Sequence, residues 1–332
     1  MTRCPGCFKP EQATYCGACR KRLFGVKKVP FILPFSRPAY DQVKLGVTTD
    51  RMSISGIQTK ISLALNAGRL EMVMSGGQYI LKPRPHGTFK RLDMVPINEH
   101  LTMQIARQVF KIEVAENALV AFEDGELAYL VRRFDVQPDG QRSLQEDFAQ
   151  IAARTEEAHG MNYKYDSSYE EIGQLIRRHV AASPVDLERF FTLVAFNYLV
   201  NNGDAHLKNF SLIKNEQADE YNLTPAYDLL NTRLHLPDET QTALELFKDG
   251  FETESYKANA YYAYDDFVEF AQRLGLVERR YKRILEMFIS KQEAVFSLIE
   301  CSMLSEECKN LYKKHVNDRI SAFSYSLAGL RI

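Results

Sequence analysis

The 332-residue sequence lacks an excess of charge of either sign. Its 42 Lys and Arg residues oppose 43 Asp and Glu residues, which gives a formal net charge of −1. This balance excludes the strong global field that would favour nucleic acid or an anionic membrane. We therefore expect neither direct DNA binding nor membrane binding.

Long hydrophobic runs are also missing. The longest apolar stretches, such as residues 190–200, are too short to span a bilayer. The opening MTRCPGC has no apolar core of a signal peptide, so we expect a cytoplasmic protein. There is no internal repeat and no low-complexity tract. A hydrophobic fraction of 45% over this length suits one two-lobed globular domain, or two small ones.

Cysteine is scarce except at the start, where Cys4, Cys7, Cys16 and Cys19 form two C-x-x-C pairs. In a reducing cytosol such clustering favours a metal over disulfides. Four thiolates make a closed tetrahedral site, which suits structural Zn²⁺ and leaves no open position for catalysis. A redox pair or an unoccupied cluster is the alternative. We predict a zinc-binding cap over residues 1–28, called the cap below.

Hydrophobic periodicity predicts a small β-rich lobe, residues 29–140, followed by a larger helical lobe, residues 141–332. Strands are expected at residues 61–66, 71–75, 78–82, 126–134, 210–214 and 221–224, and helices at 98–110, from 183, and from 265 onward. Ser183 and Pro184 are typical of a helix start, with Ser183 as the cap residue. The prediction is an α+β fold whose two lobes enclose a ligand cleft.

The most informative segment is residues 201–209, called the polar loop below. Asp204 and Asn209 have the D-x-x-x-x-N spacing of the catalytic loop of protein kinases, where Asp accepts a proton and Asn binds magnesium. Asp228 follows a predicted strand and would complete a pair of hard oxygen ligands for Mg²⁺. Lys208 could hold phosphate oxygens. The alternative is a polar turn that caps a helix, since Asn-Gly-Asp is ordinary turn chemistry.

Upstream, residues 53–60 read S-I-S-G-I-Q-T-K and precede a strand. A single glycine is weak support for a phosphate loop, because the segment is neither a Walker sequence nor G-x-G-x-x-G. Lys82 ends a predicted strand. A strand lysine that faces a cleft can neutralise nucleotide phosphates, whereas an exposed lysine at a strand end is the plain alternative.

Together these segments resemble the HipA family of bacterial kinases, and particularly its short HipT-like members. The resemblance runs from about residue 53 to residue 228. It rests on seven motifs in order: S-I-S-G-x-Q-x-K from Ser53, Y-I-L-K-P from Tyr79, N-E-H from Asn98, V-R-R-F-D from Val131, Q-E-D-F from Gln145, G-D-x-H-L-K-N-F from Gly203 and P-A-Y-D from Pro225.

The resemblance implies a role for each matching residue. Asp204 matches the general base, Asn209 and Asp228 the magnesium ligands, and Lys82 the lysine that binds ATP phosphates. The other nucleotide-lining positions are Ser55, Gly56, Ile57, Gln58 and Thr59 in the loop, the backbone of Arg132 and Phe134 at the adenine, Asp135 at the ribose, and Gln145, His206 and Tyr227. Ser53 and Ser55 match serines that become autophosphorylated.

The resemblance also implies a function: a serine/threonine protein kinase that is the toxin of a toxin–antitoxin system. The implied substrate is an aminoacyl-tRNA synthetase, and the implied partners are a DNA-binding HipB-like antitoxin and a small HipS-like protein. The sequence departs from full-length HipA, which carries an extra N-terminal subdomain; here the cap occupies part of that place. A small-molecule kinase and a zinc-capped pseudokinase that holds a repressor remain alternatives.

Overall fold

A computed structural model describes residues 3–10, 12–25, 28–43, 60–137 and 139–329. Residues 53–59 of the predicted phosphate loop lie outside these ranges, so the predictions for them stay untested by the structure. They concern Ser53, Ser55, Gly56, Ile57, Gln58 and Thr59.

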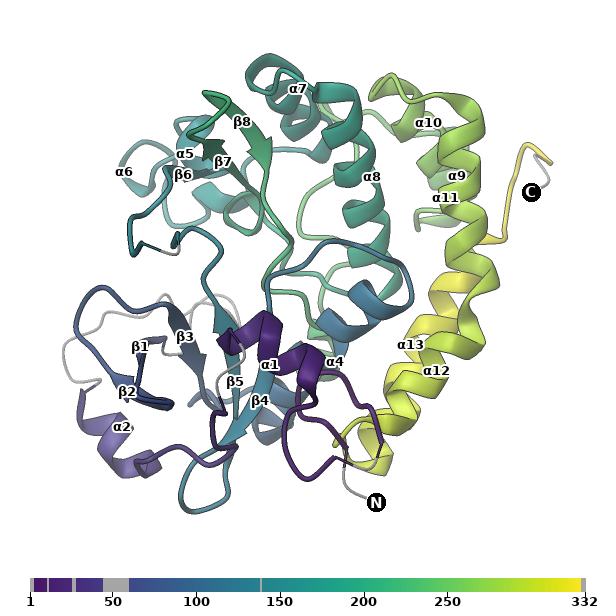
Figure 1. Ribbon diagram of the computed structural model, residues 1–332. Coiled ribbons are helices and arrows are strands. Elements are labelled where there is room, and N and C mark those ends of the chain that lie inside the picture. The colour runs from purple at the N-terminus through teal and green to yellow at the C-terminus, as the bar shows by residue number, and fades with distance from the viewer. Residues whose placement is uncertain (1–2, 11, 26–27, 44–59, 138, 330–332) are drawn as a thin grey trace.

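The smaller lobe is built on a five-stranded antiparallel sheet in the order β2–β1–β3–β5–β4 (Figure 1). Its strands are β1 (Ile61–Asn66), β2 (Arg69–Met72), β3 (Tyr79–Lys82), β4 (Asn117–Ala121) and β5 (Leu127–Arg132). Successive side chains of a strand face opposite sides. Leu119 and Tyr129 therefore join the core that contains helix α4 (Val95–Gln108), whereas Val120 and Leu130 face the cap.

The cap packs on the sheet face opposite α4. Its helix α1 (Gly17–Phe24) buries Leu23 against the sheet core. Two tyrosines tie the cap to the lobe through hydrogen bonds: Tyr15 Oη donates to Leu119 O at 2.7 Å, and Tyr79 Oη donates to Leu23 O at 2.7 Å. The cap is thus a layer of the small lobe. Its helix α1 lies on the sheet face opposite α4, and its first cysteine pair reaches α4 directly, because Gln108 Nε2 donates to Cys7 O at 3.1 Å and the ring of Phe8 packs on that of His100.

The connector after the cap covers the β4 edge. Leu33 N donates to Ala121 O at 2.8 Å, and Ala121 N donates to Phe31 O at 3.0 Å. A short helix, α2 (Arg37–Val43), follows. An edge strand whose backbone groups are paired in this way is protected from further strand pairing.

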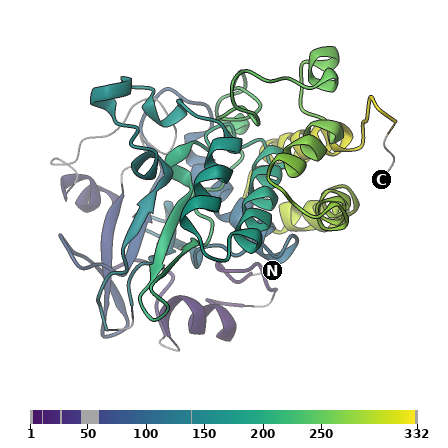
Figure 2. The same ribbon diagram turned by 90° about the horizontal axis from the view of Figure 1, so that it is seen from above.

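The larger lobe surrounds helix α8 (Ser183–Leu199), whose apolar residues are buried on most of its circumference. A three-stranded sheet, β6 (Gln145–Asp147), β7 (Ser211–Asn215) and β8 (Glu220–Leu223), faces the small lobe. The other helices are α5 (Phe148–Ile151), α6 (Glu156–His159), α7 (Tyr169–His179), α9 (Glu254–Asn259), α10 (Tyr264–Arg273), α11 (Glu278–Ser290), α12 (Gln292–Cys301) and α13 (Glu306–Phe323). Both views place α10 to α13 on the side away from the five-stranded sheet (Figures 1 and 2). Within the described ranges, no helix combines the length and apolar character needed to cross a membrane.

The predicted α+β two-lobed fold is confirmed, with differences in detail. The strand at 61–66 is correct to the residue, whereas the strand predicted at 71–75 runs from Arg69 to Met72. Ser183 does not cap α8: Ala182 holds the cap position and Ser183 is already helical. Strand β4 was not predicted, because all five of its residues are buried and its sequence has no alternation.

Candidate functional site

A cavity of about 370 Å³ lies between the two lobes. Its walls come from β3, β5, the segment after β5, β6, the polar loop and the chain before Asp228. The lining residues are Lys60, Ile80, Lys82, Ala115, Val131, Arg132, Arg133, Phe134, Asp135, Gln145, Lys164, His206, Lys208, Asn209, Tyr227 and Asp228. A volume of this size is within the range of small-molecule and cofactor sites.

A buried charge cluster lies on the wall formed by β3. Lys82 Nζ is 2.6 Å from Glu99 Oε1 of α4 and also contacts Asp228 Oδ1. Lys60 Nζ is 3.3 Å from the other oxygen of Asp228. Lys82 lies on the same strand face as Ile80, the face toward α4, which is why it meets Glu99.

Burial and charge act against each other in this cluster. Burial disfavours the charged lysine, but Asp228 and Glu99 together raise the pKa of Lys82 above its usual value. Burial raises the pKa of Glu99 to about 7, although Lys82 opposes the shift. The site therefore keeps a cationic lysine fixed between two carboxyl groups, at a position where a polyanionic ligand could replace one of them.

The polar loop is held in place by hydrogen bonds to other segments of the larger lobe. Asn201 has a left-handed φ of 54°, and its side chain donates to His315 O at 3.0 Å and accepts from Arg319 Nε at 3.1 Å. Gly203 N donates to Thr232 Oγ1 at 2.8 Å. These contacts fix the backbone before Asp204, so the carboxylate is presented by a rigid turn.

Asp204 lies beside the cavity and is not one of its lining residues. Its side chain is 5% exposed, and Oδ1 accepts a hydrogen bond from Tyr165 Oη at 2.8 Å. His206 Nε2 is 3.7 Å from the same oxygen. Burial, with the charge of Lys164 adding to it, lowers the pKa of His206 to about 3, so this ring is neutral at neutral pH.

Asn209 and Asp228 face the same cavity. Asn209 Oδ1 accepts from His206 N at 3.2 Å, and Asp228 has a left-handed φ of 54°, which is uncommon outside glycine. An amide oxygen and a carboxylate are the hard donors that Mg²⁺ prefers. The residues present fit a magnesium ion that also binds phosphate oxygens.

The opposite wall is aromatic and polar. The rings of Phe134 and Tyr227 have centroids 5.9 Å apart. Asp135 accepts from Arg133 Nε at 2.9 Å, and Gln145 Nε2 donates to Ser211 Oγ at 3.2 Å. Arg132 N donates to Glu116 O at 2.7 Å. An adenine ring at this segment would therefore need a backbone group other than the Arg132 N–H.

The four cap cysteines form a second candidate site, far from the cavity in sequence. Their sulfur atoms all lie within 4.8 Å of one another, and no cysteine among the described residues forms a disulfide. Cys16 N donates to the sulfur of Cys4 at 3.2 Å. A Cβ on Gly6 would lie 3.0 Å from Cys19 Sγ, so glycine permits the close approach of the two pairs. Four converging sulfur atoms can hold one tetrahedral metal ion.

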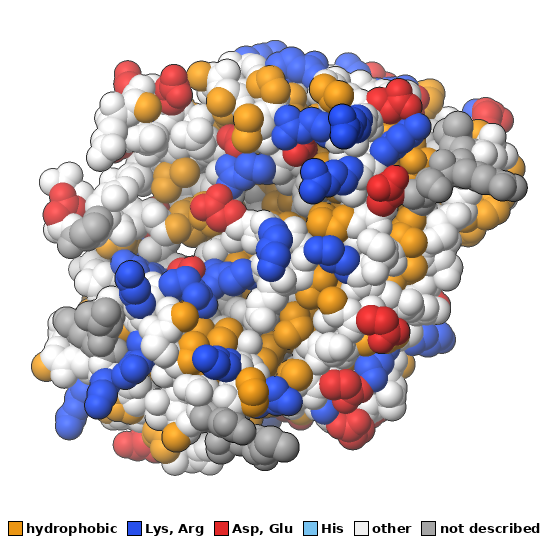
Figure 3. Space-filling view, turned by 45° about the vertical axis from the view of Figure 1, so that its right-hand side comes forward, with side chains coloured by type: hydrophobic (Ala, Val, Ile, Leu, Met, Phe, Trp, Pro, Cys, Tyr) orange, Lys and Arg blue, Asp and Glu red, His pale blue; other side chains and the backbone are white. Residues whose placement is uncertain are grey.

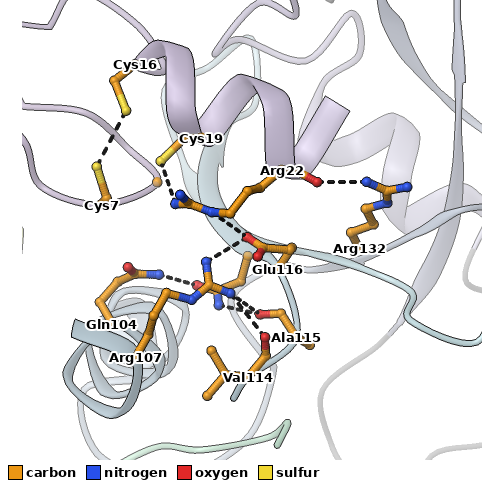
Figure 4. A network of polar contacts seen from close by, with 12 residues as sticks. Cys7, Cys16, Cys19, Arg22, Gln104, Arg107, Val114, Ala115, Glu116 and Arg132 are labelled. Atoms are coloured by element: carbon orange, nitrogen blue, oxygen red, sulfur yellow. Dashed lines mark hydrogen bonds and ion pairs between the residues drawn. The ribbon is translucent and has the colours of Figure 1, made fainter. Parts of the chain in front are cut away.

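The cap is linked to the cavity by a chain of polar contacts (Figure 4). Arg22 Nε is 3.2 Å from Glu116 Oε2, and Arg107 of α4 is 2.6 Å from the same oxygen. Arg22 O accepts from Arg132 Nη1 at 2.7 Å, and Arg22 Nη2 donates to Cys19 Sγ at 3.4 Å. One cap arginine thus contacts a cysteine, α4 through Glu116, and a residue that lines the cavity.

Several residues of the site were not predicted from the sequence, among them Glu99, Lys164 and Tyr165. Glu99 is part of the N-E-H motif. A glutamate in a largely apolar helix could have indicated a buried ion pair. Lys164, which is 3% exposed, and Tyr165 lie in an irregular segment whose sequence gives no periodic signal. Their place beside the polar loop is set by tertiary packing.

The fold and the cavity place the chain among proteins with a two-lobed kinase-like architecture. The family model described as the HipA-like C-terminal domain matches residues 52–296, and the chain belongs to this family. A Haemophilus influenzae protein named "Putative kinase" is 29% identical over 82% of each chain. The Serine/threonine-protein kinase toxin HipA of Shewanella oneidensis is 26% identical over 68% of this chain, but only 52% of the toxin is covered.

Solved structures agree on the fold. HipA of Shewanella oneidensis, in a complex with HipB and operator DNA, superimposes with a TM-score of 0.65 at 23% identity, covering 88% of this chain and 71% of that one. The Helicobacter pylori proinflammatory kinase CtkA gives a TM-score of 0.53 at 15% identity, covering 79% of this chain and 93% of that one. At sequence identities of 23% and 15%, these structural matches show a shared fold and nothing beyond it.

Proposed function

We propose that the chain is an ATP- and Mg²⁺-dependent serine/threonine protein kinase. The observation that carries this proposal is the buried Lys82–Glu99 pair, which contacts Asp228 in a cavity that Asn209 also lines. Protein kinases use such a Lys–Glu pair at the nucleotide phosphates and an Asp and an Asn at magnesium. A pseudokinase is disfavoured because Asp204 is retained together with these four groups.

Each group has a role in phosphoryl transfer. Lys82, held by Glu99, binds phosphate oxygens, and Asn209 and Asp228 would hold Mg²⁺, which would neutralise phosphate charge when bound. Asp204 accepts the proton of the acceptor hydroxyl while the hydroxyl oxygen forms a bond to the γ-phosphorus. The bond from that phosphorus to the β–γ bridging oxygen breaks, and ADP leaves. Arg132, Phe134, Asp135, Gln145, His206 and Tyr227 would line the nucleotide.

The biological role proposed is that of a toxin in a toxin–antitoxin system, acting in the cytoplasm. The family relationship, with one relative named a kinase toxin, supports this role. The proposed substrate is an aminoacyl-tRNA synthetase, and the proposed partners are a HipB-like antitoxin and a small HipS-like protein. Autophosphorylation at Ser53 or Ser55 would add negative charge near the ATP phosphates and restrain the enzyme.

The test is transfer of labelled γ-phosphate from ATP in the presence of Mg²⁺, with purified protein alone and in cell lysate. The parent should label itself and a lysate protein, which mass spectrometry identifies. Asp204→Asn and Lys82→Met should lose at least about 100-fold in rate, as expected for loss of a general base or a phosphate ligand. Asp238→Asn, at an exposed position, is the matched control. Undiminished transfer by folded Asp204→Asn would refute the assignment of the base.

A further inference from the structure

The segment at residues 160–166, called the strap below, lies against the polar loop. Its 3₁₀ turn η3 (Tyr163–Tyr165) is closed by hydrogen bonds from Tyr163 N to Gly160 O at 3.1 Å and from Tyr165 N to Asn162 O at 2.8 Å. An ion pair of 3.7 Å between Arg154 and Asp166 holds its far end. The strap is therefore a fixed turn and can position a side chain.

Three consecutive strap residues contact the site. Tyr163 Oη is 3.4 Å from Lys208 Nζ, and Lys164 is buried and lines the cavity. Tyr165 Oη donates to Asp204 Oδ1 at 2.8 Å. The strap thus lies along the polar loop, and the side chain of Tyr165 reaches the carboxylate of Asp204.

The ring of Tyr165 is itself held in place. It packs edge-on against the ring of His206, with centroids 5.1 Å apart and an interplanar angle of 78°. His206 Nε2, at 3.7 Å from Asp204 Oδ1, is beyond hydrogen-bond distance. Of these two neighbouring side chains, the phenol is therefore the one that donates to the carboxylate.

We propose that Tyr165 is a positioning residue for Asp204: its phenol holds one carboxylate oxygen so that the group meets the acceptor hydroxyl in a single orientation. The inference rests on the proposed role of Asp204 as base. A carboxylate has about four acceptor sites, so one bond from Tyr165 leaves capacity for a substrate proton. The terminal torsion of Asp is broad and roughly two-fold, and a fixed donor removes that freedom.

The contact has one competing interpretation. The phenol could occupy the place of the acceptor hydroxyl and so block the base, as an inhibitory plug would. The two interpretations predict opposite signs for the effect of removing the hydroxyl. Positioning predicts a slower reaction in Tyr165→Phe, and a plug predicts a faster one.

The experiment compares Tyr165→Phe with Tyr325→Phe, which removes the same group from an exposed tyrosine that does not line the cavity. For Tyr165→Phe we expect kcat to fall about 10- to 100-fold, the loss expected for one hydrogen bond to a charged group. The KM for ATP and the melting temperature should stay at the parent values, and Tyr325→Phe should change kcat less than about twofold. An unchanged or increased kcat in Tyr165→Phe would overturn the proposal.

A second readout does not need enzymatic activity. Carbon-13 NMR of labelled aspartate carboxyl groups, assigned with Asp204→Asn, follows the titration of Asp204 directly. Loss of a donated hydrogen bond favours the protonated carboxyl, so Asp204 should titrate at higher pH in Tyr165→Phe and not in Tyr325→Phe. Identical titration in parent and Tyr165→Phe sinks the positioning role. A failed kinase assignment would instead appear as full phosphoryl transfer by Asp204→Asn.

Discussion

The residue next to Asp204 shows how tightly the polar loop is packed. A Cβ on Gly203 would lie 2.5 Å from the carboxyl carbon of Glu239. Thr232 Oγ1 contacts that carboxyl group, accepts from Gly203 N at 2.8 Å and donates to Asn201 O at 3.0 Å. Burial, with the charge of Asp204 adding to it, raises the pKa of Glu239 to about 8. A largely protonated Glu239 therefore adds no second full negative charge beside Asp204 at neutral pH.

Gly203→Ala should push Glu239 out of this packing and lower the free energy of unfolding by about 1–3 kcal/mol, the usual cost of overpacking. In a Glu239→Ala background the same substitution should cost less, because the clashing carboxyl group is gone. Denaturant unfolding of the four proteins gives the coupling energy. Gly17→Ala, where an added Cβ meets no atom within 4 Å, is the control. Strictly additive effects would contradict the predicted clash.

At the scale of elements, the cap stabilises the small lobe by packing on its sheet. The sheet is covered by α4 on one face and by α1 with its cysteines on the other, and Arg22 joins the two coverings through Glu116. The exposed fractions of the Arg22 and Glu116 side chains, 39% and 28%, make this ion pair a weak contributor by itself. The metal that the four cysteines would hold is expected to supply most of the stabilisation of the cap.

Removing that metal should therefore weaken the whole small lobe. We expect about one zinc per chain in purified protein, as four thiolates require, and loss of zinc in Cys4→Ser. Chelation or Cys4→Ser should lower the melting temperature and weaken binding of an ATP analogue, measured by calorimetry. Cys301→Ser, outside the cap, is the matched control and should keep its zinc. A metal-free cap with unchanged stability would contradict the zinc prediction.

The helices and strands that could be predicted from the sequence are those with a local sequence signal. Strand 61–66 alternates and ends at a turn. The helix start predicted at Ser183 and Pro184 is off by one residue, because Ser183 is the first helical residue and Pro184 the second. Ser168, and not Ser183, caps a helix in the expected way. Its hydroxyl accepts a hydrogen bond from Glu171 N, and the Glu171 side chain accepts one from Ser168 N. Strand β4 is buried on both faces and gave no periodic pattern. Its position depends on partners elsewhere in the chain.

The same division holds for the candidate site. The spacing of Asp204 and Asn209, and the strand before Lys82, could be recognised from the sequence, and the structure brings Lys82, Asn209 and Asp228 to one cavity. Glu99 could not be assigned, since its role depends on how α4 packs on the sheet. Tyr165 meets Asp204 across 39 residues of chain, a contact that no local pattern encodes.

At the scale of the whole molecule, the near-zero net charge hides an uneven distribution. Lys and Arg side chains gather in a band across one face, with hydrophobic side chains between them (Figure 3). The charge total excludes a strong global field only, and local fields remain. Stability, by contrast, depends on ionisable groups in the interior, whose protonation differs between the folded and unfolded chain.

Four buried histidines dominate the predicted response to acid. Burial, the largest cause in each case, lowers their pKa values, to about 3 for His206 and about 4 for His100, His235 and His315. Between about pH 6.5 and pH 4 the unfolded chain therefore binds more protons at these sites than the folded chain. Three buried carboxyl groups act in the opposite direction but are fewer: burial raises the pKa of Glu99 to about 7 and that of Glu239 to about 8, and it also raises the pKa of Asp266.

The free energy of unfolding should consequently fall as the pH falls from about 6.5 to about 4. Each net proton of difference contributes about 1.4 kcal/mol per pH unit. Chemical denaturation at several pH values measures the slope, and His235→Gln should make it shallower. His179→Gln, at an exposed position, should leave it unchanged. A stability that rises on acidification through this window would contradict the assignment of neutral buried histidines.

Helix α13 holds α4 and the polar loop in place, although it is synthesised after both of them. Tyr312 Oη is 2.8 Å from Thr102 Oγ1 of α4, and Asn201 of the polar loop bonds to His315 and Arg319. These partners are 210, 114 and 118 residues apart in the chain. On the ribosome, α4 and the polar loop are made long before the helix that anchors both. A nascent chain that ends before α13 lacks these anchors, so translation itself delays assembly of the site until α13 has been made.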